Sequence, residues 1–390
     1  MGVPLTAKQV ADRLGVELST VYAYASRGSL TRRPGADGRT STYDADEVEL
    51  LARRARPRST RRRIGAVDLV IGTTVSEIGN GWIRYRGHDL LDLAAWATFE
   101  DTCELLWTGE LSGEPHQHRG PAAEAAAMTA AVERTVAALP HQASISARLA
   151  VGAAAASPWV PRAKTTESSV HSAALVVDAL IASLPAVGEP APVEASVAAR
   201  LWPKVSALAP TRARLRALDT LLVLLAEHEL ATSTLAVRVA ASTRAKPAEA
   251  VLAGLGTASG PFHGGAAVRV HRRLVEGLGP VDDTVLAGFG HPVHEVGDPR
   301  FAPALAGVLD IATPRRRDVI EHYVNAVPQG DPPNVDAALG AFGFAAQAEP
   351  GITEAVFVIA RTAGWLAHAF EEADELPVRF RGRTLYRGPR

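Results

Sequence analysis

A short basic segment divides this sequence into two parts that cannot share one hydrophobic core. Residues 53–63 read RRARPRSTRRR, with seven arginines, one proline and almost no apolar side chain. A segment of this composition cannot be buried, and its proline interrupts a helix, so it predicts an exposed linker. We therefore expect a small module in residues 1–52, a linker in residues 53–63 and a large body in residues 64–390.

The two parts differ in charge, although the whole chain carries a net charge of only −1. Residues 1–63 hold 13 Lys and Arg against 7 Asp and Glu, whereas the remainder holds 28 against 35. A basic head before an acidic body is one cue for a segment that faces nucleic acid. A solvated basic surface explains the same charge, so composition leaves both interpretations open.

Composition also excludes several classes of protein. The longest stretch without Asp, Glu, Lys or Arg, residues 250–268, contains glycines and a proline and does not read as a membrane span. The first residues, MGVPLTAKQVADRLG, lack the apolar core of a secretory signal, and we expect a cytoplasmic protein. The single cysteine, Cys103, excludes a disulfide framework and a cysteine-based metal site, and its apolar surroundings predict a packing role.

The head of the chain reads as two short helices followed by a hairpin. Residues 5–15 place apolar side chains at helical spacing and end at a glycine, and a second helix is expected from Ser19 to Gly28. Two short helices joined by a tight turn are typical of a helix-turn-helix unit. Turn signals at residues 34–38 then predict a wing between two strands, with another helix from Asp46 onward.

This head, with its Tyr43–Val48 ending YDADEV, resembles the winged helix-turn-helix domains of the MerR and excisionase type. The resemblance implies that the second helix enters the major groove of DNA and that basic side chains contact phosphates. The residues expected to contact DNA are Ser19, Thr20, Tyr22, Arg32, Arg33 and Arg39.

The body is predicted to be all-α. It is rich in Ala and Leu, and apolar residues recur at helical spacing, as in residues 89–106 and 214–230. β-branched alternation is scarce. Proline-rich stretches near residues 185–192 and 203–210 interrupt the pattern and predict loops between helices.

Two histidines stand in unusually small surroundings. His263 lies within SGPFHGG and His291 within GFGHP, so that backbone or a ligand can approach either imidazole closely. An isolated histidine in a loop is more often a surface or core residue than a catalytic one. Either motif alone is therefore a weak signal.

Two further groups follow these histidines. Arg300 stands nine residues after His291 and could hold a carboxylate with both arms of its guanidinium. Asp336 follows the turn PPNV and precedes an alanine-rich helix. Taken alone, Asp336 could equally be the N-cap of that helix, a common role for Asp.

In this order the motifs resemble the citrate synthase family, and the resemblance covers residues 66–390. Further matching segments are WIRYRGHD (82–89), LLWTGEL (105–111), EHELATST (227–234), IARTAGWLAH (359–368) and RGRTLYRG (381–388). The resemblance implies a large helical domain and a smaller helical domain, at approximately residues 265–342, that closes over the substrates. It also implies a homodimer, and no cofactor and no metal beyond the acyl-CoA substrate.

The resemblance implies an acyltransferase that condenses acetyl-CoA with oxaloacetate and water to give citrate and CoA. By position, Asp336 matches the base that removes a methyl proton, His263 the stabiliser of the enol, and His291 the group that polarises the ketone. The residues matching carboxylate and substrate contacts are His228, Arg300, Arg361 and, from the neighbouring subunit, Arg381. Without the resemblance, His228 would read as a core histidine in an apolar helix and Arg361 as an interface ion pair.

The chain departs from the family pattern in two places. Relatives usually read His-Gly-Gly-Ala-Asn, whereas this chain has Ala267 in the last position. Relatives often read Gly-His-Arg-Val-Tyr-Lys, whereas this chain has Pro292, His294 and Glu295. A basic residue that commonly meets the phosphates of CoA is missing there.

Three other functions are compatible with parts of the sequence. His291, His294, Glu295 and Asp298 lie close together and could bind a divalent metal ion. The body could instead be the sensor or dimerisation part of a DNA-binding regulator. The enzyme could also be a 2-methylcitrate synthase using propionyl-CoA, since one methylene group discriminates by only about 1–3 kcal/mol.

Overall fold

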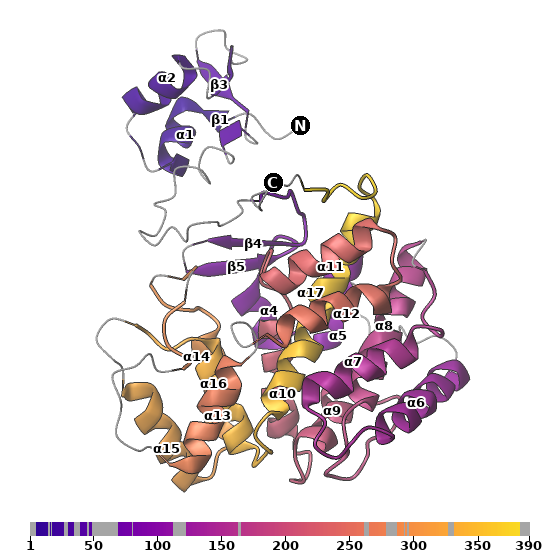
Figure 1. Cartoon of the computed structure of the whole chain (residues 1–390). Coiled ribbons are helices and arrows are strands. Elements are labelled where there is room, and N and C mark those ends of the chain that lie inside the picture. The colour runs from indigo at the N-terminus through magenta and orange to yellow at the C-terminus, as the bar shows by residue number, and fades with distance from the viewer. Residues whose placement is uncertain are drawn as a thin grey trace, which may run out of the picture. The chain divides into compact units, whose positions relative to one another are not determined.

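The chain folds into two compact units, Met1–Ile71 and Gly72–Arg390. The structure is a computed structural model, and Figure 1 shows both units. The residues it describes are 5–14, 16, 18–26, 30–34, 40–44, 47–48, 69–79, 81–111, 122–162, 165–260, 265–277, 287–291, 293–294, 296–326 and 331–382. The expected linker, residues 53–63, lies outside them.

The first unit packs two helices on a small sheet. The helices are α1 (Ala7–Leu14) and α2 (Leu18–Ser26), and the antiparallel sheet has the order β1 (Leu5–Thr6), β3 (Ser41–Tyr43), β2 (Arg32–Pro34). Its core includes Val10, Val21, Leu30, Tyr43 and Val48. The two expected helices are present within two residues of their expected ends, and the expected wing corresponds to the β2–β3 pair.

The second unit begins with a three-stranded antiparallel sheet, although sequence periodicity predicted only helices there. Its strands are β4 (Ser76–Gly79), β5 (Trp82–Tyr85) and β6 (His88–Asp89), in sequential order. Ile78 pairs with Ile83, and Arg84 with Asp89. Gly81 and Gly87 adopt positive φ in the two connections, which is why the strands can reverse so tightly. Strands of two to four residues are too short to leave an alternating pattern in the sequence.

The rest of the second unit is helical, which confirms the predicted fold class. The helices are α4 (Leu90–Trp96), α5 (Phe99–Thr108), α6 (Ala122–Ala137), α7 (Ile145–Ala156), α8 (Thr166–Ala182), α9 (Val197–Val205), α10 (Arg212–Leu225), α11 (Thr232–Ser242), α12 (Pro247–Ala258), α13 (Ala266–Glu276), α14 (Phe301–Ile311), α15 (Pro314–Asn325), α16 (Val335–Ala345) and α17 (Ile352–Ala373).

Helix α17 is the centre of this unit. It is flanked by α5, α8, α10, α11 and α12, and nearly all of its residues are buried, as its place among the other helices in Figure 1 indicates. The indole of Trp365 donates to the hydroxyl of Ser233 in α11, so the polar atom of this buried ring is paired. A helix whose residues are buried on all sides must lie inside a larger helical assembly.

Three predicted boundaries were wrong. The run expected to be helical over residues 89–106 is broken at Thr98, where a reciprocal capping box with Asp101 starts α5. The run expected over residues 214–230 ends at Leu225, so His228 lies in a loop rather than in an apolar helix. Pro203 lies inside α9 instead of in a loop.

Helices α13, α14, α15 and α16 form a second group around α16, which we call the α16 group. Helix α14 also contacts α10, and both α13 and α16 contact α17, so this group joins the rest of the unit along one side. We call α17 and the helices that flank it (α5, α8, α10, α11 and α12) the α17 bundle. In Figure 1 the α16 group lies beneath the β4–β5 hairpin and beside the α17 bundle. Loops at this boundary are therefore placed between two helical groups.

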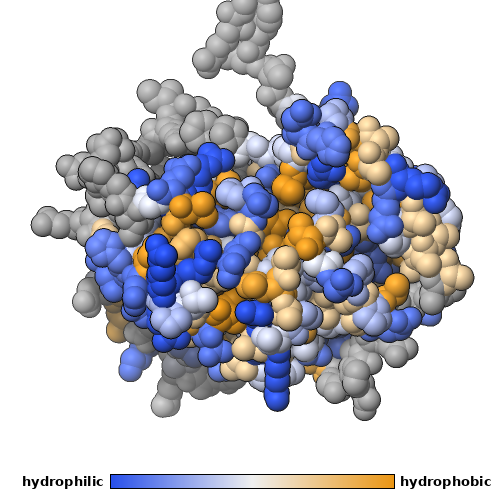
Figure 2. Space-filling view, turned by 90° about the horizontal axis from the view of Figure 1, so that it is seen from below, coloured by the Kyte–Doolittle hydropathy of each residue, from blue (hydrophilic) through white to orange (hydrophobic). Residues whose placement is uncertain are grey.

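The surface in Figure 2 shows hydrophobic side chains reaching solvent in several places, interrupted by hydrophilic ones. Large apolar side chains that remain exposed in the single chain include Leu91, Trp96, Val239, Leu376 and Val378. Within the described residues, no helix combines the length and the hydropathy needed to cross a bilayer.

His271, in α13, is completely buried, and neither ring nitrogen has a hydrogen-bond partner among the described residues. Burial, together with the charge of Arg316, lowers the pKa of His271 to about 4. The imidazole is consequently neutral in the folded protein at pH values where it is already protonated in the unfolded chain.

We predict that His271 makes the fold acid-sensitive. An unfolded histidine has a pKa of about 6.5, so the free energy of unfolding should fall as the pH decreases from about 6.5 to about 4, by up to roughly 3 kcal/mol. Urea unfolding of the wild type and of His271→Phe across this range measures the difference. Parallel pH dependences in the two proteins would contradict the prediction.

Candidate active site

Two loops of the α16 group are joined by backbone hydrogen bonds. Phe289 and Pro333 form an isolated antiparallel bridge. The amide of Gly290 donates to the Pro332 carbonyl at 2.8 Å, and the amide of Asn334 donates to the Gly288 carbonyl at 2.8 Å. His291 follows one loop and Asp336 follows the other, so this pairing fixes the distance between the two.

Gly288 is needed at its position for two reasons. Its φ of +84° lies in the left-handed region, which a residue with a side chain rarely adopts. A Cβ atom there would lie 2.9 Å from the backbone of Ala337 in α16. The glycine observed before His291 in the sequence therefore serves a close approach between the loop and α16.

Asn334, not Asp336, is the N-cap of α16. Its side-chain oxygen accepts from the amide of Asp336 at 2.9 Å, and its side-chain nitrogen donates to the Gly290 carbonyl at 2.6 Å. The capping role considered for Asp336 is therefore wrong. The Asp336 carboxylate stands in the first turn of α16, where the helix dipole favours its negative charge.

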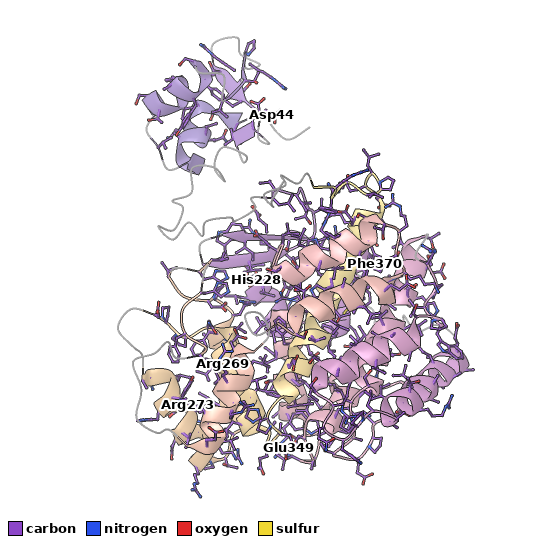
Figure 3. All side chains as sticks on the ribbon, in the orientation of Figure 1. Asp44, His228, Arg269, Arg273, Glu349 and Phe370 are labelled. Atoms are coloured by element: carbon purple, nitrogen blue, oxygen red, sulfur yellow. The ribbon has the colours of Figure 1, made fainter. Side chains whose placement is uncertain are left out.

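Three imidazoles meet at the boundary between the helical groups. The ring of His228 lies 5.1 Å from that of His291 and 5.4 Å from that of His294, and the last two rings are 4.7 Å apart, measured between centroids. The Nε2 atoms of His228 and His294 are 3.2 Å apart, a hydrogen-bond distance. His228 comes from the loop between α10 and α11, and Figure 3 shows it between the β4–β5 hairpin and the α16 group.

Backbone amides determine the tautomer of His291. Its Nδ1 atom accepts from the amides of Val293 at 3.1 Å and His294 at 3.3 Å. A neutral imidazole that accepts at Nδ1 carries its proton on Nε2. His291 thus presents an N–H donor at Nε2, which suits the polarisation of a carbonyl oxygen.

Two buried arginines border the imidazoles. Arg300 donates two hydrogen bonds of 2.9 Å to the carboxylate of Asp298, and the same carboxylate accepts from the amide of Val335 at 3.0 Å. Burial alone would raise the pKa of Asp298, but Arg300 lowers it to about 2, so the pair stays charged. The bidentate fork expected to hold a substrate is therefore used within the chain.

Arg361, in α17, lacks an acidic ion-pair partner among the described residues. Its Nε atom donates to the Leu225 carbonyl at 2.9 Å, and its guanidinium lies 5.0 Å from the centroid of the Phe357 ring. Its exposed fraction is only 3%. A buried cation without a carboxylate of its own favours an anionic ligand.

The electrostatics favour neutral imidazoles and a basic carboxylate. Burial lowers the pKa of His228 well below its ordinary value, and Arg300 and Arg361 lower it further. Burial lowers the pKa of His291 to about 4, with Arg300 acting in the same direction. Burial raises the pKa of Asp336 in spite of the nearby arginines. Such opposed shifts among neighbouring groups are typical of an active site.

The loop that carries His228 is fastened on both sides to the β4–β5 hairpin. The hydroxyl of Tyr85 donates to the Glu227 carbonyl at 2.9 Å and accepts from the Glu227 amide at 3.1 Å. On the other side, the Glu229 carboxylate accepts from the amide of Ile78 at 3.1 Å. The hairpin that sequence periodicity missed therefore positions a candidate site residue.

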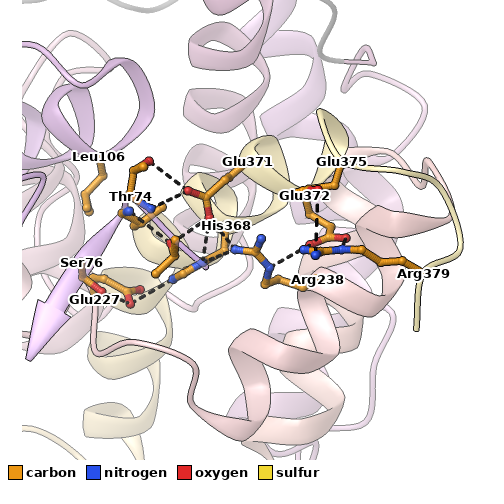
Figure 4. Close-up of polar contacts among 12 residues, drawn as sticks. Thr74, Ser76, Leu106, Glu227, Arg238, His368, Glu371, Glu372, Glu375 and Arg379 are labelled. Carbon is orange, nitrogen blue, oxygen red and sulfur yellow. Dashed lines mark hydrogen bonds and ion pairs between the residues drawn. The ribbon is translucent and has the colours of Figure 1, made fainter. Parts of the chain in front are cut away.

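A buried charge network continues from this loop into α11 and α17 (Figure 4). The Glu227 carboxylate accepts from the Ser76 hydroxyl at 3.0 Å and lies 3.1 Å from Nε2 of His368. Arg238, which is fully buried, contacts His368 at 2.8 Å and donates to two consecutive carboxylates of α17, Glu371 at 2.6 Å and Glu372 at 2.9 Å. Removing one member would leave buried charge uncompensated, so the contacts of this network are costly to break.

The three imidazoles are close enough to suggest a metal site, but the contacts disfavour one. A ring nitrogen from each lies within 4.8 Å of the others. However, Nδ1 of His291 is occupied by two amides, so in the neutral ring Nε2 bears a proton and cannot coordinate. Asp298, considered as a metal ligand, is engaged by Arg300. The positive charges that lower the pKa of His228 would also oppose a bound cation.

Some predicted residues fall outside this constellation. Arg381 is exposed in the single chain. The residues of predicted roles or departures that lie outside the described part of the chain are Arg39, His263, Pro292 and Glu295. Conversely, the structure adds Asn334 and the Glu227 network, and it gives Asp298 a positioning role in place of the metal-binding role considered above.

Comparisons with known proteins identify the family. Residues 65–383 match the family model described as citrate synthase, C-terminal domain. The chain belongs to the citrate synthase family. The putative citrate synthase 2 of Mycobacterium tuberculosis is 31% identical over 345 residues, which cover 79% of this chain and 87% of that protein. The citrate synthase of Saccharolobus solfataricus is 29% identical and covers 79% of this chain and 90% of its own length.

Solved structures share the citrate synthase fold. The citrate synthase of Pyrobaculum aerophilum superimposes with a TM-score of 0.64 at 24% identity and covers 82% of this chain and 91% of its own. The enzyme of Thermoplasma acidophilum, solved as a ternary complex with carboxymethyl coenzyme A and oxaloacetate, has a TM-score of 0.64 at 22% identity, covering 83% and 94%. The likeness extends over the second unit and shows that its helical architecture is that of citrate synthases.

Asn334→Ala should impair the site beyond its effect on stability. Loss of the cap should lower the free energy of unfolding by about 1 kcal/mol. Loss of the bond to Gly290 should also loosen the loop of His291, so the turnover number should fall several-fold. Ser196→Ala, which removes the N-cap of α9, is the matched control with a similar loss of stability and unchanged turnover. Equal turnover in both variants would contradict the positioning role of Asn334.

Proposed function

We propose that the chain condenses acetyl-CoA with oxaloacetate and water to give citrate and CoA. The observation that carries this proposal is the combination at one boundary of a basic carboxylate, Asp336, neutral imidazoles and the buried cation of Arg361. A carbon acid as weak as a thioester needs both a base and stabilisation of the enol. A dicarboxylate partner needs cations. Family membership supports the same reaction.

In the proposed reaction, Asp336 takes a proton from the methyl carbon of the thioester. The resulting enolate, stabilised at its oxygen by a hydrogen bond from the imidazole of His263, attacks the ketone carbon of oxaloacetate. The ketone oxygen becomes an alkoxide that the Nε2–H of His291 stabilises by a hydrogen bond, and the proton held by Asp336 passes to it, which regenerates the carboxylate. Water then hydrolyses the citryl thioester, which releases CoA and a tricarboxylate.

The substrate contacts in this proposal come from both helical groups. His228 and Arg361 belong to the α17 bundle, and Arg300 belongs to the start of α14 in the α16 group. A ligand that contacts both groups favours their approach and the exclusion of water. Arg300 would act on the substrate through its charge and its remaining N–H groups, since its fork holds Asp298.

We also propose that the enzyme is a homodimer in which Arg381 completes the site of the partner subunit. Arg381 is exposed in the single chain, as are Leu91 and Trp96 of α4, which suits surfaces that are covered on assembly. The match of Arg381 to a citrate synthase residue that reaches the neighbouring subunit's site supports the same assembly.

For the first unit we propose an accessory DNA-binding role of the winged helix-turn-helix type. On α2, Ser19 and the 51%-exposed Tyr22 are both accessible at helical spacing, which suits a helix presented to a groove. Arg32 hydrogen-bonds Ser41 and Arg33 lies 3.5 Å from Asp44, so both arginines are held on the β2–β3 hairpin. They are therefore weaker candidates for phosphate contacts than the sequence indicated.

Asp336→Ala should abolish the condensation. Without the base, oxaloacetate-dependent release of CoA from acetyl-CoA should fall by orders of magnitude while oxaloacetate binding persists. A thiol assay of CoA release with acetyl-CoA, and with propionyl-CoA beside it, measures the activity. Asp310→Ala, an exposed carboxylate of α14, is the control and should retain full activity. Full activity in Asp336→Ala would show that another group is the base.

If the first unit binds DNA, the affinity should fall steeply with salt because basic side chains release counterions from the phosphates. Fluorescence anisotropy with a mixed-sequence duplex between 50 and 200 mM salt, values chosen around the range over which such binding weakens by about 10³-fold or more, measures this. Tyr22→Ala should weaken binding at every salt concentration. An anisotropy that stays at the free-duplex value at low salt would overturn the proposed role.

A further inference from the structure

His294 is buried where its neighbours are exposed. Its side chain has an exposed fraction of 1%, whereas Val293 and Val296, on the same loop, have 42% and 72%. Burying an imidazole costs free energy unless its polar atoms are satisfied. Exposing the two valines also forgoes the free energy that their burial would give. The loop therefore places a polar ring inside at the expense of two apolar side chains, which indicates a role other than core packing.

His294 contacts both of the other imidazoles. Its Nε2 atom lies 3.2 Å from Nε2 of His228, and its backbone amide donates to Nδ1 of His291. His294 thus helps to fix the tautomer of His291 with its backbone, together with the amide of Val293, and engages His228 with its side chain.

The hydrogen bond between the two Nε2 atoms requires that one nitrogen carries a proton and the other does not. Nδ1 of His294 is buried and has no partner among the described residues. A buried N–H without a partner is rarer in proteins than an unpaired acceptor. The favoured arrangement therefore has His294 donating from Nε2 and His228 accepting, with the His228 proton on Nδ1.

This arrangement can convert into a site for a carboxylate without any change in net charge. If His228 moves its proton from Nδ1 to Nε2, two N–H donors 3.2 Å apart face the same space. One carboxylate can then accept from both, and two charge-assisted hydrogen bonds replace the single bond between neutral rings. The positive charges of Arg300 and Arg361 act on His228 and favour an anion there.

We propose that His294 is a second imidazole donor to the carboxylate of the 2-oxo acid that His228 binds, and that it sets the affinity of this pocket for that substrate. The proposal rests on the function proposed above and adds a specificity-determining residue to it. Nε2 of His228, the atom proposed to bind the substrate, is engaged by His294, and the carboxylate displaces this bond when it binds.

The test compares oxaloacetate binding and steady-state kinetics in variants of the full-length protein. His294→Phe keeps a ring but removes the donor, so the dissociation constant and the KM for oxaloacetate should rise about 10- to 100-fold, as expected for one hydrogen bond to a charged group. The KM for acetyl-CoA should change little. His294→Gln, whose amide nitrogen can reach the position of Nε2, should retain most of the affinity.

Comparing two polar variants, His294→Gln and His294→Asn, separates the loss of the donor from a general effect on folding. The amide of His294→Asn is too short to reach the Nε2 position, so it should weaken oxaloacetate binding more than His294→Gln at similar thermal stability. His322→Phe, which removes an exposed imidazole of α15, is the control and should bind oxaloacetate normally.

Isothermal titration calorimetry with oxaloacetate alone separates this proposal from the proposed function. An unchanged dissociation constant in His294→Phe, with wild-type protein that binds oxaloacetate and releases CoA, would overturn the role of His294 alone. Equal losses of affinity in the Phe, Gln and Asn variants, in step with lower melting temperatures, would also overturn it in favour of packing. Wild-type protein that binds no oxaloacetate would instead remove the proposed function itself.

Discussion

The site depends on the backbone pairing between the loop before His291 and the loop before α16. Two amide–carbonyl bonds of 2.8 Å and the side chain of Asn334 lock these loops together, and Gly288 permits their close approach. Because the donors and acceptors are backbone atoms and a cap, the distance between the His291 imidazole and the Asp336 carboxylate is set by the fold. The Arg300–Asp298 pair reinforces it through the amide of Val335.

Burial and fixed hydrogen bonds then determine the protonation states that the chemistry needs. Amides hold His291 as an Nε2–H donor, and the low pKa of that imidazole keeps it neutral, so it can donate without introducing a positive charge. The raised pKa of Asp336 makes its carboxylate a stronger base. The network around Arg238, together with hydrogen bonds to the β4–β5 hairpin, holds the Glu227–Glu229 loop in place, and with it His228.

The sequence predicted the helical class, because long apolar runs with a period near 3.6 reflect burial of whole helix faces. It also selected residues that the fold brings together, since glycine and proline around His291 and Asp336 mark places where backbone approaches backbone. It did not predict the end of α10 at Leu225, because Ala226 and Glu227 are compatible with a helix and only the tertiary hydrogen bonds of Tyr85 to Glu227 hold the backbone in a loop. Nor could it show that the fork of Arg300 is taken by Asp298, because a contact within two residues and a contact with a ligand leave the same motif.

The position of the imidazole pair relates ligand binding to the two helical groups. His228 belongs to the loop between α10 and α11, whereas His294 belongs to the loop that is paired with the segment before α16. Their hydrogen bond therefore crosses the boundary at which the α16 group meets the α17 bundle. A carboxylate accepted by both rings would bridge the same boundary with charge-assisted bonds, which are stronger than the neutral bond they replace. Binding of this carboxylate would then hold the two groups together, so His294 would affect their closure as well as the affinity.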